Sequence, residues 1–335
     1  MKLALTAFTR RGAALARRLA QALTEEGERC ELAFPRRLAG QLCPAAGYEA
    51  LGEWTGEQFS QVDALVFVGA CGIAVRAVAP YVRDKLTDPA VVSVDEQGRF
   101  AVPLLSGHVG GANALALRVA ALAGGQAVIS TATDVNGLFA VDVWAAERGM
   151  RFTQRTLAKE VSAALLEGRE VGFASDFGHP CPEGLRTGET ELGVWVTDKL
   201  GEGLFPRTLR LTPQSLILGL GCRRGALAPA IAAAAEEALA GLDPAAVAYA
   251  ATIDLKKDEA GLLEFCAQRG WPLRTYSAGE LARVEGEFTA SAFVASVTGV
   301  DNVCERAAVM GGGRLIVRRI AKNGVTAAVA RREIV

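Results

Sequence analysis

The sequence predicts an α/β protein with a layered N-terminal α/β domain, a small α/β middle segment and a C-terminal α/β domain with a mixed sheet. In both terminal parts, short continuously apolar runs alternate with amphipathic helical runs, which is typical of layered α/β domains. Each terminal part also contains one hairpin pattern. The stretch between them is richer in Gly, Thr, Glu and Pro. We therefore place the domains at residues 1–149, 150–213 and 214–335.

The N-terminal part opens with an expected strand over residues 2–7 and a helix over 12–26, in which leucines recur every four residues. The next expected elements, in order, are a strand over 64–69, a helix over 71–82, a hairpin of 91–94 with 100–105, a helix after residue 113, a buried strand over 127–130 and a helix over 136–148. Asp134 lies just before the last helix, so capping that helix is one role it can have.

The middle and C-terminal parts continue with weaker and then stronger patterns. The middle segment has strand candidates at 170–174 and 191–197, and its histidine, His179, lies in a turn-rich loop that favours a surface position. The C-terminal part predicts strands over 215–219 and 247–253, helices over 226–240, 258–269 and 302–310, and a hairpin of 314–320 with 325–330.

Composition excludes several classes of protein. Half of the 335 residues are apolar, 22% are charged and the formal net charge is −1, which excludes disorder and argues against a nucleic-acid partner. The first apolar run is interrupted by Arg10 and Arg11, and no later run is long enough to span a membrane, so we expect a cytoplasmic protein without a membrane partner. The seven cysteines are an odd number without a Cys-x-x-Cys pair, which predicts reduced thiols and no metal site.

The stretch from Leu104 to Asn113 has the most chemical character in the chain. It combines a hydroxyl, an amide, several glycines and His108, whose imidazole exchanges protons near neutral pH. Gly110 and Gly111 precede a helical run, so their N–H groups are expected at a helix N-terminus, facing an anion. The alternative is a purely structural strand-to-helix turn in which the histidine is only hydrogen-bonded.

Three further clusters are candidates for ligand binding. Arg223 and Arg224 follow Gly221, and paired guanidinium groups suit carboxylates or phosphates, although a solvated loop is an equal alternative. The other two clusters are residues 76–85, with Arg76, Arg83, Asp84 and Lys85, and residues 131–137. We expect both beyond the carboxyl ends of parallel strands, where open α/β sheets bind ligands. Neither a dinucleotide fingerprint nor a Walker sequence is present.

Taken together, several motifs give the chain a specific resemblance. In order, they are Gly72–Ala77, Asp84-Lys85, Asp88–Val91, Leu105–Asn113, Thr131–Asp134, Gly221–Gly225, Asp254–Lys256 and Val303–Ala307. The chain resembles the cobalt-precorrin-5A hydrolases of anaerobic cobalamin biosynthesis over nearly its whole length, and least in the middle segment. The resemblance implies a hydrolase that opens the δ-lactone of a cobalt corrinoid and releases C20 with its methyl group as acetaldehyde, which gives cobalt-precorrin-5B.

That implied reaction assigns roles to the candidate residues. His108 is the expected general base and acid, and Asp134 orients it. Ser106, Asn113 and the N–H groups of Gly110 and Gly111 are expected to donate hydrogen bonds to the oxyanion, and such a donor contributes roughly 3 kcal/mol. The residues expected to bind the carboxylate-rich substrate are Arg76, Lys85, Thr131, Thr133, Arg223, Arg224 and Lys256.

The resemblance also bears on cofactors and partners. No added cofactor is expected, because the substrate carries the cobalt and its macrocycle can receive electrons. The partners expected are the corrinoid itself, neighbouring enzymes of the pathway and a second copy in a homodimer. Two rival functions stay open. One is a non-catalytic tetrapyrrole carrier in which His108 is an axial cobalt ligand, and the other is an unrelated nucleotide-dependent enzyme.

Overall fold

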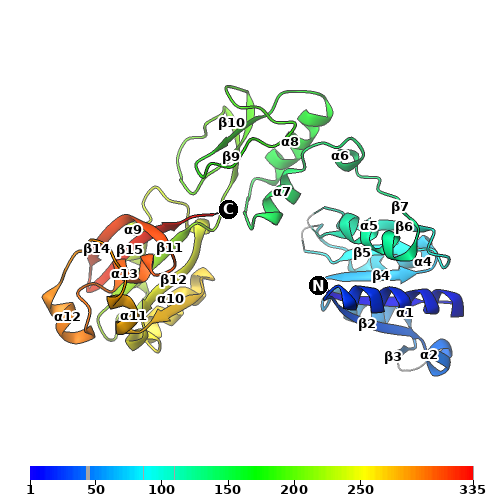
Figure 1. The fold of residues 1–335 in the computed structure, drawn as a ribbon, viewed down its shortest axis with the longest axis horizontal. Coiled ribbons are helices and arrows are strands. Elements are labelled where there is room, and N and C mark those ends of the chain that lie inside the picture. The colour runs from blue at the N-terminus through cyan, green and yellow to red at the C-terminus, as the bar shows by residue number, and fades with distance from the viewer. Residues whose placement is uncertain (43–45, 86, 109, 335) are drawn as a thin grey trace. The chain divides into compact units, whose positions relative to one another are not determined.

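The computed structural model describes residues 1–42, 46–85, 87–108 and 110–334. Val109 of the glycine-rich motif and Cys43 lie outside the described residues. The chain forms two compact units, Met1–Val143 and Trp144–Val335, and each is described separately. Both units contain β-sheets packed against helices, which confirms the predicted α/β class (Figure 1). No helix of the described residues is long and apolar enough to cross a membrane.

The first unit contains a seven-stranded sheet in the order β3-β2-β1-β4-β5-β6-β7. Its strands are β1 (Lys2–Ala7), β2 (Arg29–Pro35), β3 (Ala46–Tyr48), β4 (Ala64–Val68), β5 (Ala90–Val94), β6 (Phe100–Leu105) and β7 (Gln126–Ala127). Strands β1 to β5 pair in parallel, whereas β6 is antiparallel to β5 and parallel to β7. The predicted hairpin is therefore confirmed.

Helices cover this sheet because their apolar faces match its apolar strands. Thr9 caps α1 (Arg10–Glu25) by accepting a hydrogen bond from the Gly12 N–H, and the predicted leucines Leu15, Leu19 and Leu23 are buried in the core. The other helices of the unit are α2 (Arg36–Leu42), α3 (Leu51–Phe59), α4 (Cys71–Val78), the 3₁₀ turn η1 (Ala79–Tyr81), α5 (Ala112–Ala123) and α6 (Ala132–Val135); α7 (Val141–Glu147) crosses the boundary between the units.

Two predicted elements near residue 130 are shorter than expected. The expected buried strand over 127–130 shrinks to the two-residue β7, and none of residues 126–130 is buried. Of the expected helix over 136–148, only α7 (Val141–Glu147) forms, and a separate short helix, α6, precedes it; Asp134 lies inside α6, where it does not cap α7. Gly137 has a left-handed φ of 61°, so the chain turns where one helix was predicted.

The middle part of the second unit is a small parallel sheet in the order β10-β9-β8. Its strands are β8 (Gly172–Ser175), β9 (Leu192–Val196) and β10 (Arg207–Leu211), and α8 (Arg155–Leu166) packs against β10. Both strand candidates of the middle segment are confirmed, whereas β10 and α8 were not predicted. His179 is half-buried rather than on the open surface, because its ring packs edge to face against Trp144.

The C-terminal part of this unit contains a mixed five-stranded sheet in the order β13-β12-β11-β15-β14. Its strands are β11 (Leu216–Cys222), β12 (Val247–Ile253), β13 (Leu273–Tyr276), β14 (Gly313–Lys322) and β15 (Val325–Arg332). The helices are α9 (Ala228–Ala238), η2 (Pro244–Ala246), η3 (Asp254–Lys256), α10 (Ala260–Arg269), α11 (Ala278–Ala282), α12 (Ala292–Thr298) and α13 (Cys304–Val309). The predicted hairpin is formed by β14 and β15, which pair antiparallel.

A buried carboxylate joins the middle part to the five-stranded sheet. Asp198, just after β9, is fully buried and accepts two hydrogen bonds from the Arg331 guanidinium, at 2.6 and 2.7 Å. The Ser215 hydroxyl donates a third at 2.7 Å. These contacts explain why residues from 144 onward form one unit, because separating the two sheets would leave a buried charge without its partner. The division into domains at 149/150 and 213/214 stays a prediction.

Candidate active site

The glycine-rich loop after β6 folds into a tight turn that leads directly into α5. Ser106 has a left-handed φ of 56°, which is uncommon for a residue with a side chain. A Cβ on Gly110 would collide with the Ser106 side chain, and Gly111 itself has a φ of 83°. These two glycines are therefore required by backbone geometry, so the structural interpretation of the motif accounts for part of it.

This loop places the imidazole of His108 between two carboxylates. Its Nε2 lies 2.9 Å from Asp134 Oδ2 on α6, and its Nδ1 lies 3.4 Å from Asp142 Oδ2 on α7. The hydroxyl of Thr133, a buried residue, lies 3.1 Å from the same Nε2. With both ring nitrogens facing acceptors, the arrangement favours the doubly protonated imidazolium.

The electrostatics of the cluster follow from this geometry. The hydrogen bond to Asp142 raises the pKa of His108 above its ordinary value, against an opposing effect of burial, and the charges of Asp142 and Asp134 raise it further. Burial favours the neutral form of Asp142, but the bond and charge of His108, the Val143 N–H and the charge of Lys85 together lower its pKa. Both shifts favour the charged forms of the pair, an imidazolium facing a partly buried carboxylate.

Asn113 holds Asp134 in place from the first turn of α5. Its side-chain amide donates one hydrogen bond to Thr131 Oγ1 at 3.0 Å and another to Asp134 Oδ2 at 2.8 Å. Both amide hydrogens are used, and Asn113 is itself buried. Thr131 and Thr133, which we expected to bind substrate, instead hydrogen-bond to Asn113 and His108, respectively.

The hydrogen-bond donors expected for an oxyanion are already occupied. The Ser106 hydroxyl donates to the Asp88 carbonyl at 2.9 Å, and the Gly111 N–H donates to the His108 carbonyl at 2.9 Å. The Asn113 amide is occupied as described above. A tight, partly buried turn must satisfy its own polar groups, so these donors stabilise the loop and are not presented to a ligand. This corrects the expected oxyanion site for Ser106, Gly111 and Asn113.

The antiparallel direction of β6 determines at which end of the strands the His108 loop lies. Because β6 runs antiparallel to β5, the loop after β6 meets the segment before β5, and Asp88 of that segment receives the Ser106 bond. The residues 131–137 do follow a strand, β7, that is parallel to β6. The Arg83–Lys85 segment, however, precedes β5, so our placement of this cluster at the carboxyl ends of the parallel strands is wrong.

The two basic residues predicted for the first unit behave differently. Lys85 is exposed and acts on the charge of Asp142, so it belongs to the surroundings of the site. Arg76 donates to the Gly72 carbonyl one turn earlier in α4, and no contact joins it to the His108 cluster within the described residues. Asp142 was missed by sequence reasoning. Its one signal was an acidic side chain at the start of the short apolar run Val141–Trp144.

A second candidate cluster lies at the carboxyl ends of β11 and β12. Glu259 accepts a hydrogen bond from the Gly225 N–H at 2.5 Å and forms an ion pair with Lys256 at 3.1 Å. The Gly225 N–H is the largest cause of the lowered pKa of Glu259. Because Glu259 neutralises Lys256, this lysine is less suited to binding a substrate carboxylate than we expected. Arg223 and Arg224 are exposed, and within the described residues neither forms an ion pair.

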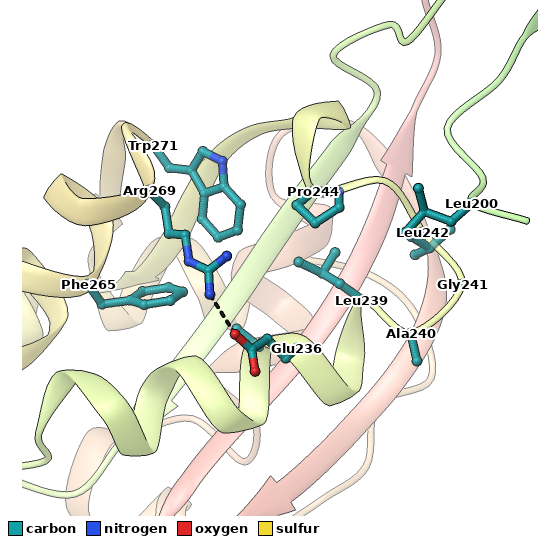
Figure 2. A pocket seen from close by; sticks show the side chains of 11 residues that line it. Leu200, Glu236, Leu239, Ala240, Gly241, Leu242, Pro244, Phe265, Arg269 and Trp271 are labelled. Atoms are coloured by element: carbon teal, nitrogen blue, oxygen red, sulfur yellow. Dashed lines mark hydrogen bonds and ion pairs between the residues drawn. The ribbon is translucent and has the colours of Figure 1, made fainter. Parts of the chain in front are cut away.

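A cavity of about 230 Å³ lies at the other end of the same strands, where β12 begins. Figure 2 shows the side chains that line it. Phe265, Trp271 and Leu239 line it, and the ion pair of Arg269 with Glu236 lies along one wall. Ligand pockets usually measure about 300–1,000 Å³, so this cavity is small for a macrocycle. In addition, its guanidinium is already neutralised. We therefore do not assign the substrate to it.

The structure provides no reason to place a metal ion on the protein's own residues. Among the described residues, no group of three or more His, Cys, Asp or Glu side chains is arranged to hold one. The six cysteines that the structure describes are free thiols. An axial role for His108 in a carrier protein is also disfavoured by the geometry, because both of its nitrogens face carboxylates.

Comparison with known proteins shows the same order of parts from residue 53 to residue 330. Family models described as the cobalamin synthesis G N-terminal, central and C-terminal regions match residues 53–134, 139–213 and 216–330. The chain is 35% identical over 343 residues to the cobalt-precorrin-5A hydrolase of Salmonella typhimurium, covering 97% of this chain and 96% of the relative. The chain belongs to the cobalt-precorrin-5A hydrolase family.

One further relative and one solved structure are also similar to the chain. The cobalt-precorrin-5A hydrolase of Priestia megaterium is 32% identical over 297 residues, covering 81% of this chain and 79% of that one. A solved structure of a cobalamin biosynthesis protein G homologue from Sulfolobus solfataricus aligns with 99% of this chain and 97% of its own at 19% identity, with a TM-score of 0.43. Within this hydrolase family, His108 and Asp134 lie in the matched N-terminal region, and Asp142 lies in the central one.

Proposed function

We propose that this chain is a cobalt-precorrin-5A hydrolase, which opens the δ-lactone of that cobalt corrinoid and releases acetaldehyde to give cobalt-precorrin-5B. The observation that supports this most directly is the 35% identity to a hydrolase of that name over 97% of the chain. A carrier role gains no support from the structure, because the imidazole that would ligate cobalt lies between two carboxylates.

We assign the activation of water to Asp134. Its carboxylate receives both hydrogen bonds, from His108 and Asn113, at Oδ2, so within the described residues Oδ1 is left for a water molecule. Its side chain is 36% exposed, against 14% for Asp142, so Asp134 is the carboxylate that a substrate can reach. Two fixed donors keep this carboxylate oriented, which is the condition for efficient proton transfer.

His108 then acts first as an acid. Water adds to the lactone carbonyl while Asp134 takes its proton, and the tetrahedral intermediate expels the ring oxygen, which receives the Nε2 proton of the imidazolium. The products of this step are a carboxyl group and an alcohol. The raised pKa of His108 supports this order of events, because it favours the protonated form that can donate.

The neutral imidazole is then ready to act as a base. It removes the proton of the new alcohol, the adjacent C–C bond breaks, and acetaldehyde leaves. The electron pair passes into the macrocycle of the substrate, which takes up a proton. We propose that no added cofactor is needed, because the substrate supplies both the cobalt and the electron sink. We further propose that the enzyme works in the cytoplasm, where its free thiols stay reduced.

The direct test is a reaction of the purified protein with cobalt-precorrin-5A, without added nucleotide, flavin or metal. We expect one acetaldehyde for each lactone opened, trapped with a hydrazine reagent and identified by mass spectrometry. Recovery of acetic acid in place of acetaldehyde, or strict dependence on an added cofactor, would overturn the proposal. Light scattering of the same sample separates a monomer from a homodimer, and neighbouring enzymes of the pathway can be added to test for complex formation.

A further inference from the structure

Two leucines on the loops after β11 and β12 are unusually exposed. Leu227 is 71% exposed and Leu255 is 64% exposed, which places them among the most exposed large apolar side chains of the described residues. Leu227 lies at the N-cap of α9, and Leu255 lies in η3 after β12. Large exposed apolar side chains on neighbouring loops are typical of a binding surface.

These leucines lie on two loops that contact each other. The strands β11 and β12 are parallel neighbours, so the loops after them leave the same edge of the sheet. Glu259 joins the loops through the Gly225 N–H and the Lys256 ammonium. A Cβ on Gly261 would collide with the Ala226 carbonyl, so the start of α10 lies directly against the first loop. The surface is therefore preformed rather than dependent on loop closure.

The basic residues of this edge add charge to the apolar surface. The N–H of Arg223 donates to the Gly324 carbonyl at 3.0 Å, which fixes its backbone beside the β14–β15 turn while its side chain stays exposed. Arg224 is also exposed and acts on the charge of Glu259. Neither guanidinium has an ion-pair partner within the described part of the chain, so both can bind external carboxylates.

We propose that Leu227 and Leu255 form, with Arg223 and Arg224, a platform that binds the apolar face of a tetrapyrrole-like macrocycle while the arginines bind its peripheral carboxylates. This assignment rests on the proposed function and adds residues that the motifs did not indicate. A flat ring with an apolar face and anionic rim matches both properties of the surface, whereas a small polar anion would leave the leucines in water.

The platform can be tested without the native substrate by using uroporphyrin, an octacarboxylate tetrapyrrole, as the probe. Its fluorescence is titrated with the full-length wild-type protein and with the double variant Leu227→Ser/Leu255→Ser. Burial of two leucines contributes enough that we expect the double variant to bind about tenfold or more weakly. Serine is a favourable N-cap residue, so the change at position 227 does not threaten α9.

The matched control is Val297→Ser, because Val297 is 62% exposed in the same unit but lies on α12. We expect it to bind uroporphyrin within about twofold of wild type. Citrate, a carboxylate ligand without an apolar face, is added as a competitor and is expected to be equally effective against wild type and the double variant. Wild-type affinity in the double variant, or an equal loss in the Val297 variant, would overturn the platform.

Kinetics with cobalt-precorrin-5A separate this proposal from the proposed function. We expect the double variant to raise KM by about tenfold while kcat is kept, because the platform binds substrate without touching the reacting atoms. If wild type turns over and the double variant has an unchanged KM, the platform is wrong and the function stands. If wild type releases no acetaldehyde but still binds uroporphyrin through the leucines, the function is wrong and the platform stands.

Discussion

The two glycine-rich motif loops of this chain, one around His108 and one around Arg223, differ in whether their polar side chains are bonded within the unit or exposed. In the loop around His108, the hydroxyl, the amide and the Gly111 N–H are all bonded within the unit, and the imidazole is enclosed by carboxylates. In the loop around Arg223, the guanidinium groups remain exposed and without ion pairs among the described residues. The first loop is arranged to hold a proton and the second to attract an anion. Changes in the first should therefore act on kcat, and changes in the second on KM.

The largest expected effect comes from removing the imidazole. We expect His108→Ala to lower kcat by roughly a hundredfold or more at saturating substrate, because a positioned acid and base is lost. Acetaldehyde release measures the rate, and thermal unfolding checks the fold. The matched control is His179→Ala, the other histidine, whose ring packs on Trp144 and which we expect to leave kcat nearly unchanged. Near-wild-type turnover of the His108 variant would end its place in the mechanism.

The next largest effect distinguishes binding from chemistry. Replacing Arg223 and Arg224 together with alanine should raise KM by roughly tenfold and leave kcat within about twofold, because a carboxylate clamp stabilises ground and transition states alike. Arg269→Ala is the control, since Arg269 lies at the other end of the strands, away from Arg223 and Arg224, and is paired with Glu236. A fall in kcat with an unchanged KM would show that the comparison between the two loops is wrong.

A smaller effect tests how the imidazole is held. Asp142→Asn replaces the charged hydrogen-bond acceptor that raises the pKa of His108 with a neutral amide, so the imidazolium should lose its proton at a lower pH than in wild type. If His108 acts first as an acid, the alkaline limb of the kcat profile moves to lower pH, and kcat at its optimum falls roughly tenfold. Glu147→Gln, an exposed carboxylate on the same helix, should leave the profile in place. An unmoved alkaline limb in Asp142→Asn would exclude this coupling.

The sequence was sufficient for features set by local patterns. The alternation of strands and helices, both hairpins and the packing face of α1 follow from periodicity and turn residues. The contact of His108 with Asp134 was implied by the family resemblance. It was not sufficient for features set by the path of the chain. The direction of β6 determines which loops meet, and the turn at Gly137 brings Asp142 to the second nitrogen of His108. Hydrophobic periodicity carries no information about a contact between two such separate segments.

The same limit applies to the hydrogen-bond donors. Ser106 and Asn113 have the right chemistry for an oxyanion, and sequence reasoning assigned them to it. Whether a donor is free depends on the acceptors that the fold places beside it, and here the Asp88 carbonyl and the Asp134 carboxylate occupy both residues. A loop with buried polar groups must pair them internally. Residue type alone therefore overestimates how many groups of a motif face the substrate.

The smallest expected effect is on stability, and it compares the two histidines directly. The folded state raises the pKa of His108, so its stabilising contribution is fully present below its unfolded pKa of about 6.5 and is lost as the pH rises through the folded value. Burial, followed by the charge of Arg148, lowers the pKa of His179, so its contribution is present above the unfolded value and is lost as the pH falls through the folded one.

His108→Gln should therefore reduce the free energy of unfolding more at pH 5.5 than at pH 9, whereas His179→Gln should reduce it more at pH 8 than at pH 5. Each difference should be on the order of 1 kcal/mol or less, typical of one partly exposed charged contact. Urea unfolding followed by circular dichroism at the four pH values measures both. Parallel pH dependence of the two variants would mean that the carboxylates do not distinguish the histidines, and the assignment of proton transfer to His108 would lose its electrostatic basis.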